Sequence, residues 1–345
     1  MNIKKITALA LAAVLAAAGF TGCSKNYDTV VTVEDTAFSP SMYLCAQYQA
    51  YNAAWEEVSE DTTDLFKATI DDMSAEEWIY AETIRNLQIF AWTEKTYSEM
   101  GLSLDEEEQG YIDYQVEYYW PYMEEYYSAN GIGKDTYAKF TELNYKANEI
   151  FAEIYKDGSE KAPTEAECRA YMDENYTRVK GFYMPKYNAD GTELDEKGKQ
   201  AVLDLCDEAM AELSAGGSIY EICSKYKTKA TLITGDKNDY SDGSVYVTET
   251  YVGRTSDTFP QIVCDNAFKM EENGSFICDE TKNSYFIYQR VPNFADNSEF
   301  TTMKSSILSE MKGPEHNEYV ETEAVKLEVK ENTAAVKHYS VKNIK

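Results

Sequence analysis

The spacing of apolar residues predicts a helical region in the first part of this 345-residue chain. Between residues 39 and 155, apolar side chains recur at steps of three and four, the period of a helix with one buried face. Four helices are expected, and Pro121 is expected to kink the third. They begin at Ser39-Pro40, at Ser74, near Ser103 and near Lys134. A fifth, short helix follows the capping residues Thr164 to Glu167.

Between residues 179 and 291 the pattern changes to short strand-like runs that alternate with helices. The runs Val179–Met184 and Ser284–Val291 are rich in aromatic and β-branched side chains. Val245-Tyr246-Val247 is a third strand-like run. Two amphipathic helices and a shorter helical piece from Pro260 to Phe268 lie between the runs. We therefore expect an α+β module that folds as its own domain.

The C-terminal part returns to a helical pattern. An amphipathic helix is expected over Asn297–Lys312, a strand over Val325–Val329 and a short helix over Thr333–Ser340. A second small strand is expected near the other end, at Val30–Val33. A strand near each end, with helices between, indicates that the two ends of the chain pack together.

The α+β module resembles the parvulin-type peptidyl-prolyl isomerases over about the whole length of their domain. The resemblance is carried by Val179-Lys180-Gly181, Leu213 to Tyr226, Phe259 with Ala267-Phe268, Asn273-Gly274-Ser275, and Tyr285 to Val291. It implies a β-α-β domain with a groove that grips a proline ring. The substrate-binding candidates are Tyr183, Phe259, Phe268 and Phe286. The alternative is that these aromatics only fill a core, which is the preferred interpretation of Phe268.

The module departs from that family at two positions. Parvulins carry a histidine on the first strand and another on the last, and the similar positions here hold Tyr183 and Phe286. The chain has only His316 and His338, both outside the module. Isomerisation of an X-Pro bond crosses a barrier of about 18–20 kcal/mol and needs groups positioned against the twisted amide. We therefore assign no catalytic residue, although an active isomerase that uses other groups remains the alternative.

With a strand near each end and helices between, the chain resembles the PrsA and SurA foldases over nearly all of its mature part. In those proteins a helical domain built from both chain ends carries an inserted parvulin domain. The resemblance implies a helical chaperone domain over residues 23–175 and 296–345. The parvulin-like domain would then occupy residues 176–295. The implied partners are unfolded, newly exported polypeptides.

The first residues have the pattern of a bacterial secretion signal. Lys4-Lys5, an apolar run to Ala18 and the pair Gly22-Cys23 form a charged, an apolar and a cleavage region. The run is shorter than the roughly 20 residues of a membrane span. Gly22-Cys23 resembles a lipobox. Residues 1–22 are therefore expected to be removed, and Cys23 is expected to carry the lipid that anchors the protein to the cell membrane on its extracytoplasmic side. The alternative is a simple secretory signal that leaves Cys23 as a thiol.

Charge and cysteine content narrow the classes of function. The chain has 61 acidic and 32 basic residues, for a net charge of −29. Such acidity repels phosphate backbones, so no nucleic-acid partner is expected. The six cysteines after Cys23 form no Cys-x-x-Cys pair and have no histidine near them. No metal or cofactor is therefore expected, and no disulfide is predicted.

Aromatic residues crowd the third predicted helix. The expected core stripe is Ile112, Val116, Tyr119, Met123 and Tyr126. Off this stripe lie Tyr114, Tyr118, Trp120, Tyr122 and Tyr127. Because one buried face cannot absorb so many rings, we expect some of the second set to be exposed and to bind unfolded segments.

The sequence thus predicts a surface-tethered folding factor with a parvulin-like domain that has lost its histidines. The competing interpretations are an active prolyl isomerase and a solute-binding lipoprotein. Solute binders usually alternate strand and helix in doubly wound lobes, whereas this chain gathers its helices at one end.

Overall fold

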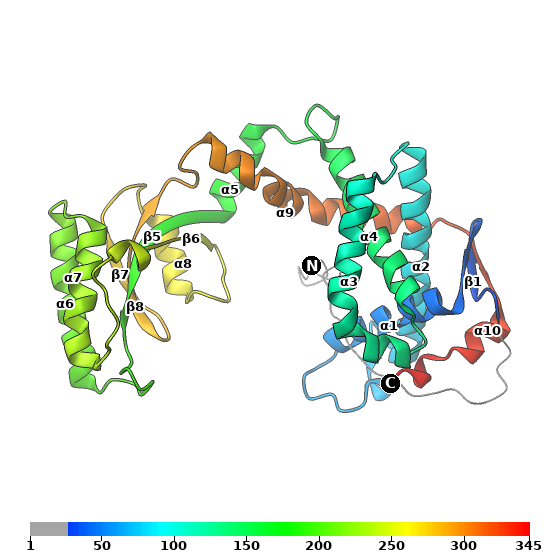
Figure 1. Ribbon diagram of the computed structural model, residues 1–345, viewed down its shortest axis with the longest axis horizontal. Helices are drawn as coiled ribbons and strands as arrows, with labels where there is room; N and C mark the ends of the chain where they lie inside the picture. Colours follow the sequence, from blue (N-terminus) through cyan, green and yellow to red (C-terminus); the bar gives the residue numbers. More distant parts are fainter. Residues whose placement is uncertain (1–26) are drawn as a thin grey trace. The chain divides into compact units, whose positions relative to one another are not determined.

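The computed structural model describes residues 27–345, so Cys23 and the signal sequence lie outside the described part. The chain divides into two compact units (Figure 1). The first combines the residues up to Ala162 with Lys312–Lys345, and the second is Pro163–Met311. The predicted α+β class is confirmed, since helices and antiparallel sheets occur together in the chain.

Four long helices dominate the first unit. They are α1 (Pro40–Glu56), α2 (Ala75–Glu99), α3 (Glu106–Ala129) and α4 (Lys134–Tyr155). The caps expected at Ser39 and Ser74 are present, and Ser74 forms a capping box with Glu77. The third helix, expected to begin near Ser103, begins at Glu106 and is capped by Asp105. Helix α3 continues through Pro121.

A small sheet joins the two ends of the chain within this unit. Strand β1 (Val31–Val33) pairs with β2 (Thr36–Phe38) and with β9 (Val329–Glu331), both antiparallel. Figure 1 shows the blue β1 beside the red C-terminal segment. The strand predicted over Val325–Val329 is present only at its last residue, because α9 (Asn297–Ala324) runs on past Pro314 and residues 325–327 form the turn that ends it.

Shorter elements complete the first unit. They are the hairpin β3 (Thr69–Ile70) and β4 (Met73–Ser74), the helix α10 (Thr333–His338), and the 3-10 turns η2 (Leu65–Lys67) and η4 (Val341–Asn343). Helices α2 and α4 are joined by Lys146, which is nearly buried and pairs with Glu94 at 2.9 Å and Glu142 at 2.6 Å. Burial pushes the pKa of Glu94 upward, but Lys139 and Lys146 outweigh it and leave that pKa below its usual range. Lys146 is thus a paired structural cation.

The second unit is built on one four-stranded antiparallel sheet in the order β6-β5-β8-β7. Its strands are β5 (Tyr176–Pro185), β6 (Thr248–Gly253), β7 (Ile277–Glu280) and β8 (Ser284–Val291). One face packs against α6 (Glu196–Ser214) and α7 (Ile219–Thr234) through Phe182, Met184 and Ile287. The other face packs against α8 (Gln261–Lys269) through Val263, Cys264 and Ala267. Adjacent strand residues point to opposite faces, which explains why Phe182 and Tyr183 belong to different cores.

The prediction of a strand at Val245–Val247 is wrong. Residues Gly243–Val245 form the 3-10 turn η3, and the strand begins only at Thr248. The Asp242 side chain accepts from the Ser244 N–H at 2.9 Å and so starts a turn instead of a strand. Gly243 lies against the backbone of α7, where a Cβ would come 1.9 Å from the Tyr220 carbonyl oxygen. This close contact fixes the turn.

The second unit is longer than the module expected at residues 176–295. It also takes in α5 (Glu165–Asn175) and the first half of α9. The reason is a small core in which Cys168 and Met172 of α5 pack against Phe300 and Ile307 of α9. Among the described residues, no helix is long and apolar enough to span a membrane.

Candidate functional site

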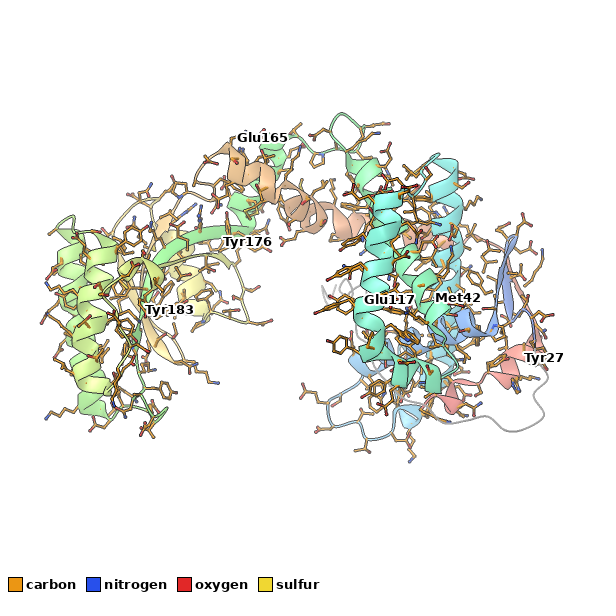
Figure 2. The ribbon with its side chains drawn as sticks, in the orientation of Figure 1. Tyr27, Met42, Glu117, Glu165, Tyr176 and Tyr183 are labelled. Atoms are coloured by element: carbon orange, nitrogen blue, oxygen red, sulfur yellow. The ribbon has the colours of Figure 1, made fainter. Side chains whose placement is uncertain are left out.

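Two of the predicted site residues are direct neighbours across the sheet of the second unit. Tyr183 on β5 faces Phe286 on β8 in the antiparallel register. Their ring centroids are 4.4 Å apart and the planes are inclined by only 16°, so the rings stack (Tyr183 is labelled in Figure 2). The two positions at which the resemblance places histidines therefore hold one stacked aromatic pair.

Phe286 is at the centre of this aromatic group and is completely buried. Its ring stacks on Tyr288 at 4.6 Å and lies 5.9 Å from Phe259. Gly181 is required beside this group, because a Cβ there would lie 2.3 Å from the Ile287 carbonyl oxygen, 2.6 Å from Tyr288 Cβ and 2.9 Å from the Phe286 ring. This geometry favours a core role for Phe286. We call Tyr183, Phe259, Phe286 and Tyr288 the sheet cluster.

The other candidates differ in their surroundings. Tyr183 and Phe259 are half-buried at the edge of the same core. Phe268 is also half-buried but is not part of that core, and the Arg254 guanidinium lies 4.4 Å from its ring centroid. The structure thus brings together three of the four predicted residues and leaves Phe268 apart.

Polar groups beneath the sheet cluster are paired with one another. The Tyr288 hydroxyl donates to Asp279 Oδ2 at 2.6 Å, and Asn266 Nδ2 donates to both carboxylate oxygens of Asp279 at 3.0 Å. Burial raises the pKa of Tyr288, and the neighbouring Asp279 carboxylate raises it further. The hydroxyl therefore stays protonated at neutral pH and holds the carboxylate in place.

Sequence reasoning missed Tyr288, Asp279 and Asn266. Tyr288 could have been found, because it stands two residues after Phe286 and so shares its face of the strand. No pattern in the sequence signals Asn266 or Asp279, because these side chains meet only through the fold. Asn266 and Asp279 line an open hollow of about 290 Å³ together with Lys269, Met270 and Ile277.

Helix α3 buries a different stripe from the one expected. The buried residues are Ile112, Val116, Trp120, Met123 and Tyr127, followed by Ala129 at the end of the helix. The expectation that Tyr119 and Tyr126 belong to the core is wrong, since Tyr119 is exposed and Tyr126 is half-buried. After Val116 the stripe takes a step of four instead of three, which brings Trp120 and Tyr127 inward. Their rings pack against Tyr137 of α4, each at 5.7 Å.

The opposite side of α3 carries a row of exposed tyrosines. Tyr111, Tyr114, Tyr118 and Tyr122 follow one another at steps of three and four, so they line up along the helix. Their exposed fractions are 54%, 61%, 51% and 63%. Neighbouring rings contact each other, with centroid distances of 6.0 Å from Tyr114 to Tyr118 and 6.2 Å from Tyr118 to Tyr122. We call these four residues the tyrosine face, and for Tyr114, Tyr118 and Tyr122 the predicted exposure is confirmed.

The surroundings of the tyrosine face are acidic. Helix α3 contains seven acidic residues and no basic one. The acidic residues are Glu106, Glu107, Glu108, Asp113, Glu117, Glu124 and Glu125. Glu117, labelled in Figure 2, pairs with Lys134 at 2.6 Å and still has 72% of its side chain exposed. Among residues 27–345, no group of three or more histidine, cysteine, aspartate or glutamate side chains could hold a metal ion.

Comparisons with known proteins give only distant similarities. No family model and no curated protein matches the chain. Among solved structures it is similar to the foldase protein PrsA of Streptococcus pneumoniae, with 16% identity over 79% of this chain and 98% of that chain, and a TM-score of 0.37. PrsA of Lactococcus lactis is 11% identical over 92% of this chain and 100% of that chain, with a TM-score of 0.37. PrsA of Bacillus subtilis is 15% identical over 83% of this chain and 92% of that chain, with a TM-score of 0.26. Such TM-scores mean that the backbones superpose poorly, so the function of this chain rests on its own residues.

Proposed function

We propose that this protein is a membrane-anchored, extracytoplasmic folding factor that holds unfolded exported polypeptides. In this proposal the helical first unit does the holding, and the parvulin-like second unit has little or no isomerase activity. The observation that carries the proposal is the tyrosine face of α3, a row of large side chains that are more than half exposed. Tyrosine offers apolar area together with a polar hydroxyl, and it loses little entropy on binding because its side chain has few rotatable bonds.

The strength expected of such a surface suits transient holding. Each aromatic ring that a client covers contributes on the order of 2 kcal/mol. Three or four rings thus give a gross gain of about 6–8 kcal/mol, most of which offsets the lost freedom of association. The net binding is weak and reversible, which allows a client to leave and fold.

The sheet cluster supports the second part of the proposal. Tyr183 and Phe286 stack against each other and carry no group that changes protonation near neutral pH. Phe286 is fully buried, so it offers no surface to a proline ring.

The proposed membrane anchor is inferred from the sequence around Cys23. Cys23→Ser should release the protein from the membrane fraction.

The holding function can be tested with a chemically unfolded client of near-neutral charge. We expect the mature chain to suppress its aggregation, measured by light scattering, and the triple variant Tyr114→Gln, Tyr118→Gln, Tyr122→Gln to lose most of that effect. Glutamine keeps helix propensity, so α3 should persist. The matched control is Leu232→Ser with Val245→Ser, which removes two exposed apolar side chains, 88% and 71% exposed, from the second unit.

The same preparation tests the competing enzyme. Acceleration of prolyl isomerisation in a tetrapeptide should be small or absent. Robust acceleration that disappears in a folded Tyr183→Ala variant would replace the holding proposal with an active isomerase. Equal suppression of aggregation by the triple variant and the unchanged chain would remove the tyrosine face from the proposal.

A further inference from the structure

We propose that the tyrosine face selects basic, extended segments of its clients, rich in lysine and arginine. This inference rests on the proposed holding function and adds a substrate class to it. Two features of α3 carry it beyond the exposed rings themselves: carboxylates that lie beside the rings, and the capacity of those carboxylates for a further partner.

The first feature is the position of carboxylates beside the rings. Glu117 follows Tyr114 by three residues, and Glu125 follows Tyr122 by three, so each pair lies one turn apart on the helix surface. A lysine or arginine that stacks on the face of one of these rings is therefore within reach of a carboxylate. Cation–π contact and ion pairing would act on the same side chain of the client.

The second feature is that these carboxylates keep capacity for a partner. Glu117 pairs with Lys134 but remains largely exposed. Glu124 and Glu125 are exposed, and no base of the described residues forms an ion pair with either. Among the described residues, Asp113 accepts a hydrogen bond from the neutral amide of Gln109 at 2.9 Å and forms no ion pair. A basic client thus meets negative charge that the described part of the chain does not neutralise.

Other occupants fit the surface less well. Acidic segments, anionic lipid surfaces and nucleic acids meet repulsion from seven carboxylates, and so does a second copy of a chain with net charge −29. Neutral apolar segments meet the rings but gain nothing from the carboxylates. Charge complementarity therefore points to a cationic, unfolded segment.

The test uses three labelled peptides of equal length and equal aromatic content that carry four lysines, four glutamines or four glutamates. Binding to the full mature chain is measured by fluorescence anisotropy. We expect the lysine peptide to bind about tenfold more tightly than the glutamine peptide in dilute buffer, and the glutamate peptide to bind most weakly. At 0.5 M salt the lysine preference should fall to about twofold, because salt screens exposed charges.

Two variants locate the preference. Asp113→Asn, Glu124→Gln, Glu125→Gln should remove about tenfold from lysine-peptide affinity and leave glutamine-peptide affinity unchanged. The matched control Asp207→Asn, Glu271→Gln, Glu272→Gln makes the same charge change on exposed residues of the second unit and should leave the preference intact. Tyr114→Phe, Tyr118→Phe, Tyr122→Phe keeps the rings and should bind like the unchanged chain.

The outcomes separate this inference from the proposed function. Equal affinity for lysine and glutamine peptides, or equal loss of preference in the control variant, would overturn the inference while suppression of aggregation still stands. If the unchanged chain fails to suppress aggregation at all, the proposed function fails first. Loss of the lysine preference in the variant Asp113→Asn, Glu124→Gln, Glu125→Gln, with the preference kept in the control variant, supports the inference.

Discussion

The tyrosine face of α3 and the sheet cluster use the same kind of side chain for opposite purposes. In the sheet cluster, Tyr183, Phe286 and Tyr288 stack at 4.4–4.6 Å with planes inclined by 16°. On α3, the rings of Tyr114, Tyr118 and Tyr122 touch at 6.0–6.2 Å and are more than half exposed. Aromatic content alone therefore does not reveal function, because rings stacked on each other within a core are no longer available to a client.

The difference follows from the geometry of the two elements. Neighbouring strands are about 4.8 Å apart, so rings at paired positions stack on one side of the sheet. A helix buries only one stripe, and α3 fills its stripe with Ile112, Val116, Trp120, Met123 and Tyr127. The remaining tyrosines have no buried place in this unit. Under the proposed function, these are the rings that a client would cover.

The largest expected effect distinguishes the two groups by stability. Phe286→Ala should lower the free energy of unfolding of the second unit by about 3–4 kcal/mol, because it leaves a cavity in a fully buried core. Tyr118→Ala should change stability by less than about 0.5 kcal/mol, since it removes an exposed ring. Denaturant unfolding followed by circular dichroism measures both values.

The tryptophans provide an internal control for this comparison. All four, Trp55, Trp78, Trp92 and Trp120, lie in the first unit. Phe286→Ala should therefore leave the transition seen by tryptophan fluorescence unchanged while it shifts the transition of the second unit. A Phe286→Ala protein as stable as the unchanged chain would show that the sheet cluster is not a core.

Local signals in the sequence predicted where the helices begin, and the strand near each end predicted that the two chain ends pack together, but the residue-by-residue register of the strands could not be predicted. The capping boxes at Ser74 and Thr164 depend on residues three positions apart, and both form as expected. The pairing of Tyr183 with Phe286 joins residues about a hundred positions apart, and no periodicity defines that register. The exchange of Tyr119 for Trp120 in the core of α3 has the same origin. A choice between steps of three and four depends on the neighbouring helix, here through Tyr137.

The next prediction concerns a third aromatic group, in which the central ring can gain a charge. His316 is nearly buried between Phe151, at 5.1 Å, and Tyr155, at 5.8 Å. Burial, and to a lesser degree the Lys161 ammonium, lower the pKa of His316 from 6.5 to about 4. Between pH 6.5 and about 4, the His316 imidazole is therefore protonated in the unfolded chain but neutral in the folded chain. The first unit should be fully stable above pH 6.5 and lose about 3 kcal/mol as the pH falls from 6.5 to 4.

His316→Phe isolates this effect from the carboxylates that titrate in the same range. The variant keeps a ring among Phe151 and Tyr155 but cannot be protonated. The difference in the free energy of unfolding between the two proteins is followed by tryptophan fluorescence. It should shrink steadily above pH 4 and level off above pH 6.5. A difference that does not depend on pH would mean that the imidazole is not held neutral by its surroundings.

The smallest predicted effect asks whether a hydroxyl matters equally in the two aromatic groups. Tyr288→Phe keeps the stacked ring and removes the hydroxyl that donates to Asp279 at 2.6 Å. A hydrogen bond to a charged group contributes about 1.5–3 kcal/mol, and Asp279 retains Asn266 as a donor, so we expect a loss of roughly 1.5 kcal/mol in the second unit. Tyr118→Phe should cost nothing measurable, because water replaces any partner of an exposed hydroxyl. If Tyr288→Phe also proved neutral, Asp279 would have to be held by Asn266 alone, and only the rings would hold the sheet cluster together. Equal losses in both variants would instead show that the tyrosine face already has partners within the chain and is less available to a client than its exposure indicates.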